Sequence, residues 1–158
     1  MGAQFIGGFL GGVVAKSQLG KGITIGHPAV NPEFDDYAAL SCEVMFTFML
    51  CYIVLSTATV KKSEGNPFFG LCIGLTVTAG AYTVGNISGG AFNPAVGLGL
   101  PVLAGGAGSL WVYVVGDFIG AIFAAVAFVL TNPEEFLAAA EEPKRATGLE
   151  ANVGSDAL

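Results

Sequence analysis

The stretch GNISGGAFNPAVG, which runs from Gly85 to Gly97, decides the fold that we expect for this chain. Asparagine is a good N-terminal capping residue, and proline suits the first position of a helix, where a missing N–H costs nothing. The pair Asn93-Pro94 therefore predicts a helix start. The apolar residues that follow it give a short helix over about 93–104, and the glycines before it let the backbone pass close to other helices.

Long apolar segments lie on both sides of this stretch. A helix needs about 17 to 25 apolar residues to cross a bilayer, and three segments reach that length: 38–60, 68–84 and 110–130. A fourth segment, 3–15, is too short and is expected to be a partial span. Only 11% of the residues are charged, whereas soluble domains carry about 25%. These features indicate an all-α membrane protein.

Polar segments separate the spans and suggest their orientation. A polar loop is expected over 16–37, a short basic turn over 61–67 and an acidic tail over 132–158. The tail is poor in aromatic residues, so we expect it to be disordered. Basic residues gather in cytoplasmic loops, and those of the turn and the tail would share one side of the membrane: Lys61, Lys62, Lys144 and Arg145. The turn and the tail are therefore expected to be cytoplasmic.

Composition and motifs exclude several classes of function. The net charge of −6 comes mostly from the tail, and no basic patch indicates nucleic-acid binding. We find no nucleophile–base pair and no metal-ligand spacing, so we expect neither an enzyme nor a metal or cofactor. Cys42, Cys51 and Cys72 lie in apolar runs and are interpreted as small buried hydrophobic residues.

The residues alone leave two interpretations of the segment 85–108 open. It could be an extracellular loop that carries a capped surface helix. It could also be a re-entrant half-helix that dips to the middle of the membrane. Irregular backbone at that depth is tolerated only where it is buried in protein or lines a water-filled path.

The sequence resembles the aquaporins, which form the major intrinsic protein family. SGGAFNPAV, preceded by GLTVTAGAYTVGN, is similar to the second Asn-Pro-Ala loop and the end of the fifth helix of that family. The segment 38–60, with Glu43 near its start, resembles the fourth helix, and WVYVVGDFIGAI resembles the sixth. AQFIGG, with Gln4, resembles the third helix. The resemblance implies an aquaporin-like helical bundle with a re-entrant half-helix, in a channel domain over residues 1–131.

The family contains two inverted repeats, each with one Asn-Pro-Ala half-helix, and this sequence contains only the second repeat in full. The first two helices and the first Asn-Pro-Ala loop have no counterpart in it, and the third helix is cut short. We therefore expect a fragment or a truncated gene product. The run His27-Pro28-Ala29-Val30 mimics the triplet. We reject it as a second motif because it lies in a polar loop and is followed by acidic residues.

The resemblance assigns a pore role to several residues. Asn93, Pro94 and Ala95 would form the pore motif, in which the amide of Asn93 donates to a passing water or hydroxyl oxygen. Backbone carbonyls would accept hydrogen bonds along the outer half of the pore; they belong to Gly89, Gly90 and Ala91. Three of the four selectivity-filter positions map to Ala81, Gly90 and Val96. Water-selective members place His and Arg at the first and last of these, so a wide, apolar filter is implied here.

Further residues are assigned to support the loop. The resemblance implies that Glu43 accepts hydrogen bonds from the loop backbone and that Gln4 supports the same packing. Asp117 stands where the family usually has proline. It could reach toward the membrane surface, pair with a polar loop or contact the repeat that is absent here. The pairs Gly116/Gly120 and Gly7/Gly11 are read as helix-packing positions.

The function implied by the resemblance is a passive transmembrane channel for water and small neutral solutes. Glycerol, urea, ammonia and hydrogen peroxide are candidate solutes, and a homotetramer in a lipid bilayer is the expected assembly of the complete form. Two alternatives remain open. One is a non-conducting, truncated member that associates with full-length channels, and the other is a proton-coupled carrier that uses Glu43 and Asp117. Plasma and vacuolar or other internal membranes are not distinguished.

Overall fold

The computed structural model describes residues 2–19, 26–105 and 108–135, and every regular element in these ranges is helical. Five helices are present in chain order: α1 (Gly2–Leu19), α2 (Asp36–Val54), α3 (Phe69–Ser88), α4 (Pro94–Ala104) and α5 (Leu110–Thr131). A π-helical turn (Leu55–Thr59) continues α2, and a 3-10 turn (Lys61–Ser63) follows it. The all-α fold class is confirmed.

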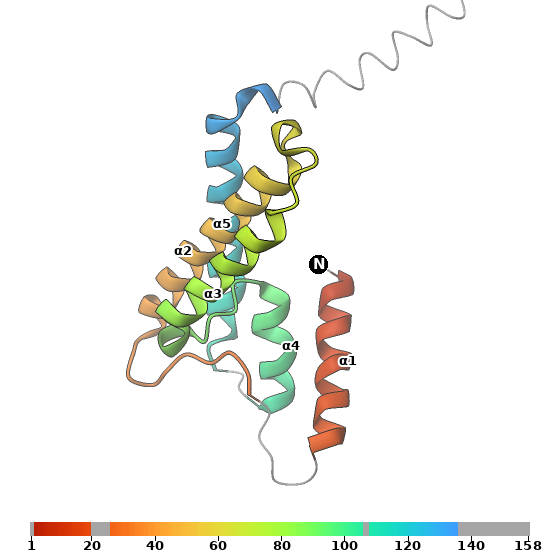
Figure 1. The fold of residues 1–158 in the computed structure, drawn as a ribbon. Helices are drawn as coiled ribbons and strands as arrows, with labels where there is room; N and C mark the ends of the chain where they lie inside the picture. Colours follow the sequence, from red (N-terminus) through yellow and green to blue (C-terminus); the bar gives the residue numbers. More distant parts are fainter. Residues whose placement is uncertain (1, 20–25, 106–107, 136–158) are drawn as a thin grey trace, which may run out of the picture.

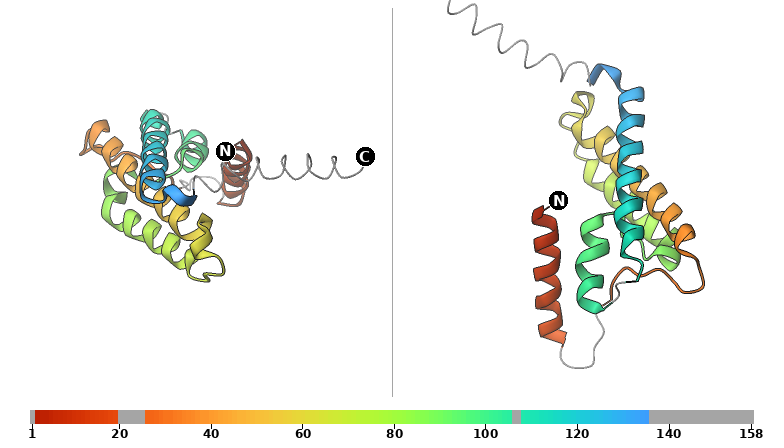
Figure 2. Two further views of the ribbon diagram at one scale, coloured as in Figure 1. Left: turned by 90° about the horizontal axis from the view of Figure 1, so that it is seen from above. Right: turned by 180° about the vertical axis from the view of Figure 1, so that it is seen from behind.

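Three helices in the described ranges are long and apolar enough to cross a membrane. They are α2 with its π-helical turn (24 residues), α3 (20 residues) and α5 (22 residues). These three helices pack into one bundle, in which α2 contacts both of the others (Figure 1). The two views of Figure 2 show α4 beside this bundle and α1 on the far side of α4. Helix α1 therefore joins the fold mainly through α4.

The chain follows a re-entrant path between α3 and α5. Helix α3 ends near the lower end of the bundle in Figure 1; the chain then turns back and starts α4 partway along the bundle. Helix α4 runs back to the lower end, where α5 begins. With only 11 residues, α4 is about 16 Å long at 1.5 Å per residue. It is therefore too short to cross a bilayer, and its N-terminus lies at the inner end of the excursion.

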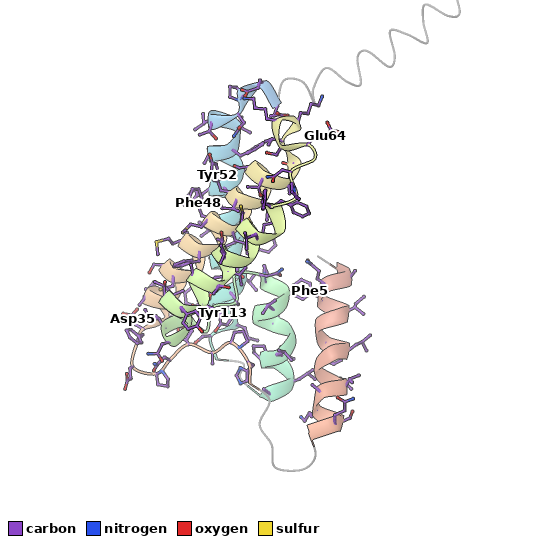
Figure 3. All side chains as sticks on the ribbon, viewed as in Figure 1. Phe5, Asp35, Phe48, Tyr52, Glu64 and Tyr113 are labelled. Atoms are coloured by element: carbon purple, nitrogen blue, oxygen red, sulfur yellow. The ribbon has the colours of Figure 1, made fainter. Side chains whose placement is uncertain are left out.

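Hydrogen bonds and an ion pair hold the elements together at the two ends of the bundle. At one end, Lys62 forms an ion pair with Glu134, just after α5. At the other, the carboxylate of Asp36 accepts from the Ser109 hydroxyl (2.8 Å) and the Trp111 indole N–H (3.0 Å). Figure 3 shows Asp35 and Glu64 at these opposite ends. The basic turn and the end of α5 thus share one end. Lys144, Arg145 and the other tail residues from 136 onward lie outside the described residues.

The observed helices are longer than the sequence suggested at several ends. Helix α1 continues to Leu19, so Lys16 is helical and not part of the loop that we expected over 16–37. Its ammonium group donates to the carbonyl of Leu103 in the last turn of α4 (3.3 Å), where a cation favourably meets the helix dipole. Helix α3 continues four residues past 84, through Gly85, to Ser88.

Candidate functional site

The connection between α3 and α4, residues 89–93, is the irregular segment that we name the pore loop. It is anchored by Glu43 of α2, whose side chain is fully buried. One carboxylate oxygen accepts from the Ser88 hydroxyl (2.6 Å) and the Ala91 N–H (3.1 Å), and the other accepts from the Phe92 N–H (2.7 Å). Because a buried carboxylate is costly without such donors, Glu43 and the loop stabilise each other. These are the contacts that the family resemblance implied for Glu43.

The same hydrogen bonds fix the direction of the loop carbonyls. In a planar trans peptide, the C=O of one residue points opposite to the N–H of the next, and no described peptide bond is cis. The N–H of Gly90 donates to Ser88 Oγ (3.2 Å), and those of Ala91 and Phe92 donate to Glu43. The preceding carbonyls therefore point away from this support. They belong to the expected set: Gly89, Gly90 and Ala91.

Left-handed backbone gives the pore loop its sharp turn. Gly89 (φ 86°) and Gly90 (φ 63°) adopt conformations that other residues rarely take, and Phe92 (φ 49°) does so despite its side chain. The Phe92 ring is buried against Phe46, with the ring centroids 5.5 Å apart. A Cβ on Gly80 would lie 2.7 Å from the Phe92 ring, so glycine is needed there to make room. Packing thus holds Phe92 in its strained conformation.

Asn93 caps α4 and keeps its amide group available. Its side-chain oxygen accepts from the Ala95 N–H (2.9 Å), and Pro94 takes the first helical position. Its NH2 group donates to no residue that the structure describes. The amide lies at the positive end of the α4 dipole. A donor group and a helix N-terminus therefore face the same space.

That space is a groove of about 450 Å³ between α1 and α4. Its walls are mostly apolar, and they are formed by a glycine-rich face of α1 and the first turns of α4: Gln4, Gly7, Gly8, Gly11, Gly12, Asn93, Ala95, Val96 and Leu100. Val96 is 44% exposed and lies beside Asn93, since residues three apart share one face of a helix. Asn93 and Val96 thus line the same groove.

The other two filter positions meet at the pore loop. A Cβ on Gly90 would lie 3.7 Å from the Cα of Ala81, so the two residues are neighbours. Ala81 is exposed on α3, and Gly90 is half-buried. The structure thus brings Ala81 and Gly90 together, whereas Val96 lies in the groove with Asn93.

The expectation for Gln4 is wrong in its location. We expected Gln4 to support the packing of Glu43, but it is exposed on α1 and lines the groove beside Asn93. The partners of Glu43 in the described residues come from 88–92 instead. Helix α1 packs mainly on α4, which places Gln4 beside the first turn of α4.

Sequence reasoning missed Tyr113 and Ser88. The buried Tyr113 hydroxyl donates to the carbonyl of Ser88 (2.6 Å), which ties α5 to the end of α3 (Figure 3). Gly97 lies directly against Tyr113, and a Cβ there would overlap with the tyrosine side chain. One tyrosine thus contacts both helices that flank the pore loop. The position of Tyr113 in the sequence, 20 residues after Asn93, does not predict these contacts.

Asp117 lies in the seam between α2 and α5, which we name the α2–α5 seam and define by Glu43, Thr47, Gly116, Asp117 and Gly120. It is 1% exposed, and one carboxyl oxygen accepts from the Thr47 hydroxyl (2.9 Å). Two of the open expectations are therefore wrong, because Asp117 neither reaches the membrane surface nor pairs with a polar loop.

Comparison with known proteins agrees with this architecture. The family model for the major intrinsic proteins matches residues 1–128. The chain is 30% identical over 139 residues to aquaporin NIP2-3 of Zea mays, covering 88% of this chain and 45% of the relative. It is 33% identical over 129 residues to glycerol uptake facilitator protein-like 6 of Lactiplantibacillus plantarum, covering 78% and 59%.

A third relative is the probable aquaporin NIP4-2 of Arabidopsis thaliana, at 36% identity over 86 residues, covering 54% of this chain and 30% of the relative. The chain thus spans between 30% and 59% of the length of these three relatives. The family model, the apolar spans and the re-entrant helix α4 all support the same family assignment. The chain belongs to the major intrinsic protein, or aquaporin, family of multi-pass integral membrane proteins.

Proposed function

We propose that this chain supplies one half of a passive transmembrane channel for water and small neutral solutes. The observation that carries the proposal is the two-sided pore loop. Its N–H groups bind Glu43 and Ser88, so three carbonyls point away from this support, and the Asn93 NH2 group donates to no residue that the structure describes. Family membership supports a channel rather than an enzyme, and relatives are named aquaporins and a glycerol uptake facilitator.

The geometry suggests how water passes while ions do not. Carbonyls accept hydrogen bonds from water, and the Asn93 NH2 donates to its oxygen. The N-terminus of α4 carries a partial positive charge of about half an elementary unit. That field repels cations and protons at the narrowest part of the path. A second half-helix of the family type would add the opposing donor, so that the central water could not relay a proton.

The filter residues favour solutes larger than water. Ala81, Gly90 and Val96 are small or apolar, and none supplies a fixed charge. Selection would then rest on size and on the hydrogen bonds of the pore loop. We propose permeation by some of glycerol, urea, ammonia or hydrogen peroxide besides water, in a channel that assembles as a homotetramer in a lipid bilayer.

A completed channel tests this function. Residues 1–135 are joined to the first two helices and the first Asn-Pro-Ala loop of the Lactiplantibacillus plantarum relative, reconstituted in vesicles and examined by stopped-flow light scattering. We expect osmotic water permeability well above that of empty vesicles, without ion conductance in planar bilayers. Ion currents that match the water flux, or a correctly inserted protein without water flux, would rule the proposal out.

A further inference from the structure

The hydrogen bonds of Asp117 account for only one of its two buried carboxyl oxygens. One oxygen accepts from Thr47 (2.9 Å). The other is buried and has no hydrogen-bond partner among the residues that the structure describes. Buried polar atoms in folded proteins are nearly always paired. An unpaired carboxylate oxygen in a span would be especially costly, so its protonation state needs an explanation.

Glu43 is the acidic neighbour of Asp117 in the α2–α5 seam. A Cβ on Gly116 would lie 3.0 Å from the Cβ of Glu43. Thr47, one helical turn after Glu43, donates to Asp117. Residues 43 and 47 of α2 thus lie directly against residues 116 and 117 of α5. Two negative charges on neighbouring buried side chains strongly disfavour each other.

No cation compensates for these two acids in the described part of the chain. Helices α2 and α4 pack against α5. The ionisable groups that face Asp117 are Glu43 and Cys51 from α2 and Tyr113 from α5 itself, and α4 carries none. The basic residues in the described ranges lie near helix ends or in loops: Lys16, His27, Lys61 and Lys62.

Of the two acids, Glu43 has more hydrogen-bond donors to stabilise a negative charge. It accepts three hydrogen bonds from Ser88, Ala91 and Phe92, all of which favour a carboxylate. Asp117 accepts one. A carboxylate offers about four acceptor positions, so Glu43 can accept one more donor.

We propose that Asp117 is a positioning residue that carries a proton on its unpaired oxygen and presents it to Glu43. The neutral acid then acts as a donor, and the charged Glu43 keeps its hold on the pore loop. The inference rests on the proposed function in one respect only, namely that the pore loop held by Glu43 affects flux through a channel. The proton on Asp117 is a property of the folded chain and is measured without any flux.

Infrared spectroscopy of the chain in lipid vesicles tests the proton directly. A protonated carboxylic acid has a C=O stretching band that a carboxylate lacks. We expect this band to persist near pH 7, about three units above the usual pKa of aspartic acid. It should disappear entirely in Asp117→Asn. In Glu64→Gln, which removes an exposed acid in the 61–67 turn, the band should be unchanged.

A second variant keeps the test decisive if Asp117→Asn does not fold. Thr47→Val has nearly the same shape and removes the hydrogen bond to the Asp117 C=O. The band should remain and move to higher frequency, because the carbonyl loses its donor. The absence of the band near pH 7 in the folded parent would overturn the proposal. So would a band that is lost in Glu43→Gln but retained in Asp117→Asn, since the proton would then lie on Glu43.

Discussion

Asn93 performs two tasks with one side chain. Its oxygen caps α4 through the Ala95 N–H, and the residue lines the groove with an NH2 group that donates to no described residue. The cap could be predicted from the local pair Asn93-Pro94, because capping depends on neighbouring residues alone. The free NH2 group could be predicted from the cap as well. An amide whose oxygen accepts the capping hydrogen bond still has its NH2 group available to donate.

In a completed channel, Asn93→Asp should separate these tasks. Aspartate caps a helix as well as asparagine and suits the dipole, so α4 should remain folded. The pore would lose its donor and gain a negative charge. We expect a lower water flux and weaker exclusion of cations, measured in oocytes. Asn66→Asp is the matched control, because Asn66 also accepts from a backbone N–H (Phe68, 2.9 Å) but lies in the 61–67 turn. Unchanged flux and ion exclusion in Asn93→Asp would mean that Asn93 does not face the pore.

Val96→Arg tests the filter in the same completed channel. Arginine would narrow the opening and add a positive charge with several N–H donors. Uptake of urea and glycerol should fall far more than water flux, in stopped-flow assays of the same vesicles. An equal loss of all three would indicate a blocked or misfolded pore. Exclusion of urea by the parent channel would show that these three residues do not set its width.

Glu43→Gln should loosen the pore loop. Glutamine offers one acceptor oxygen where glutamate offers two, so at least one of the three donors loses its partner. An unpaired buried donor costs about 1–3 kcal/mol, which corresponds to about 5- to 150-fold faster amide hydrogen exchange at Ala91 or Phe92. Exposed Glu33→Gln is the control and should change neither amide. Unchanged exchange at both amides in Glu43→Gln would refute the anchoring role.

Residues outside the local motif were harder to predict. Glu43 could be assigned only through the family resemblance, since it lies about 50 residues from the loop that it binds. Tyr113 and Ser88 were missed because a hydrogen bond between distant helices leaves no periodic pattern. Gln4 was placed on the wrong side of the loop for the same reason: sequence does not give the face of α1 that meets α4.

At the level of helices, glycine positions determine which faces pack. The sequence indicated Gly116 and Gly120 correctly, and both lie against α2. The pair Gly7/Gly11 was wrong as a packing contact within the described residues, because nothing lies within 4 Å of a Cβ at either position. Gly8 and Gly12 face α4 instead. Either Gly7 with Gly11 or Gly8 with Gly12 could form the packing face of α1. The sequence does not distinguish these two faces, and only the contacts with α4 show which one packs.

A matched pair of glycine substitutions tests the α2–α5 seam. A Cβ on Gly120 would lie 2.5 Å from the carbonyl oxygen of Val44, and backbone cannot move aside cheaply. We expect Gly120→Ala to lower the free energy of unfolding by about 1–3 kcal/mol, measured by denaturation in detergent. Gly74→Ala has open space around it and should be neutral or stabilising by up to about 1 kcal/mol. Equal effects of both substitutions would contradict the close packing of this seam.

Helix ends show how tertiary contacts override local composition. Polar Lys16 looked like the start of a loop, but its long side chain reaches α4, so α1 continues past it. Gly85 looked like the start of the loop before α4, but α3 continues to Ser88, whose hydroxyl donates to Glu43. In both helices, a contact with another element lies within the part that continues beyond the expected end.

On the scale of the whole molecule, the described helices form a bundle with a groove on one side. The bundle of α2, α3 and α5 supports the pore loop from behind, and the groove that Asn93 lines is open. The chain covers 45% and 59% of two of its relatives. A pore that depends on a second half should therefore not form from this half alone, since loop backbone would otherwise face lipid.

The most direct test measures osmotic water permeability for three preparations at equal protein density in vesicles: this chain alone, the first two helices and first Asn-Pro-Ala loop of a relative alone, and the two joined. We expect both halves alone to match empty vesicles and the joined protein to exceed them clearly. A correctly inserted joined protein that stays at the empty-vesicle value would favour a non-conducting family member. High water permeability of this chain alone would contradict the proposal that it supplies only one half of the pore.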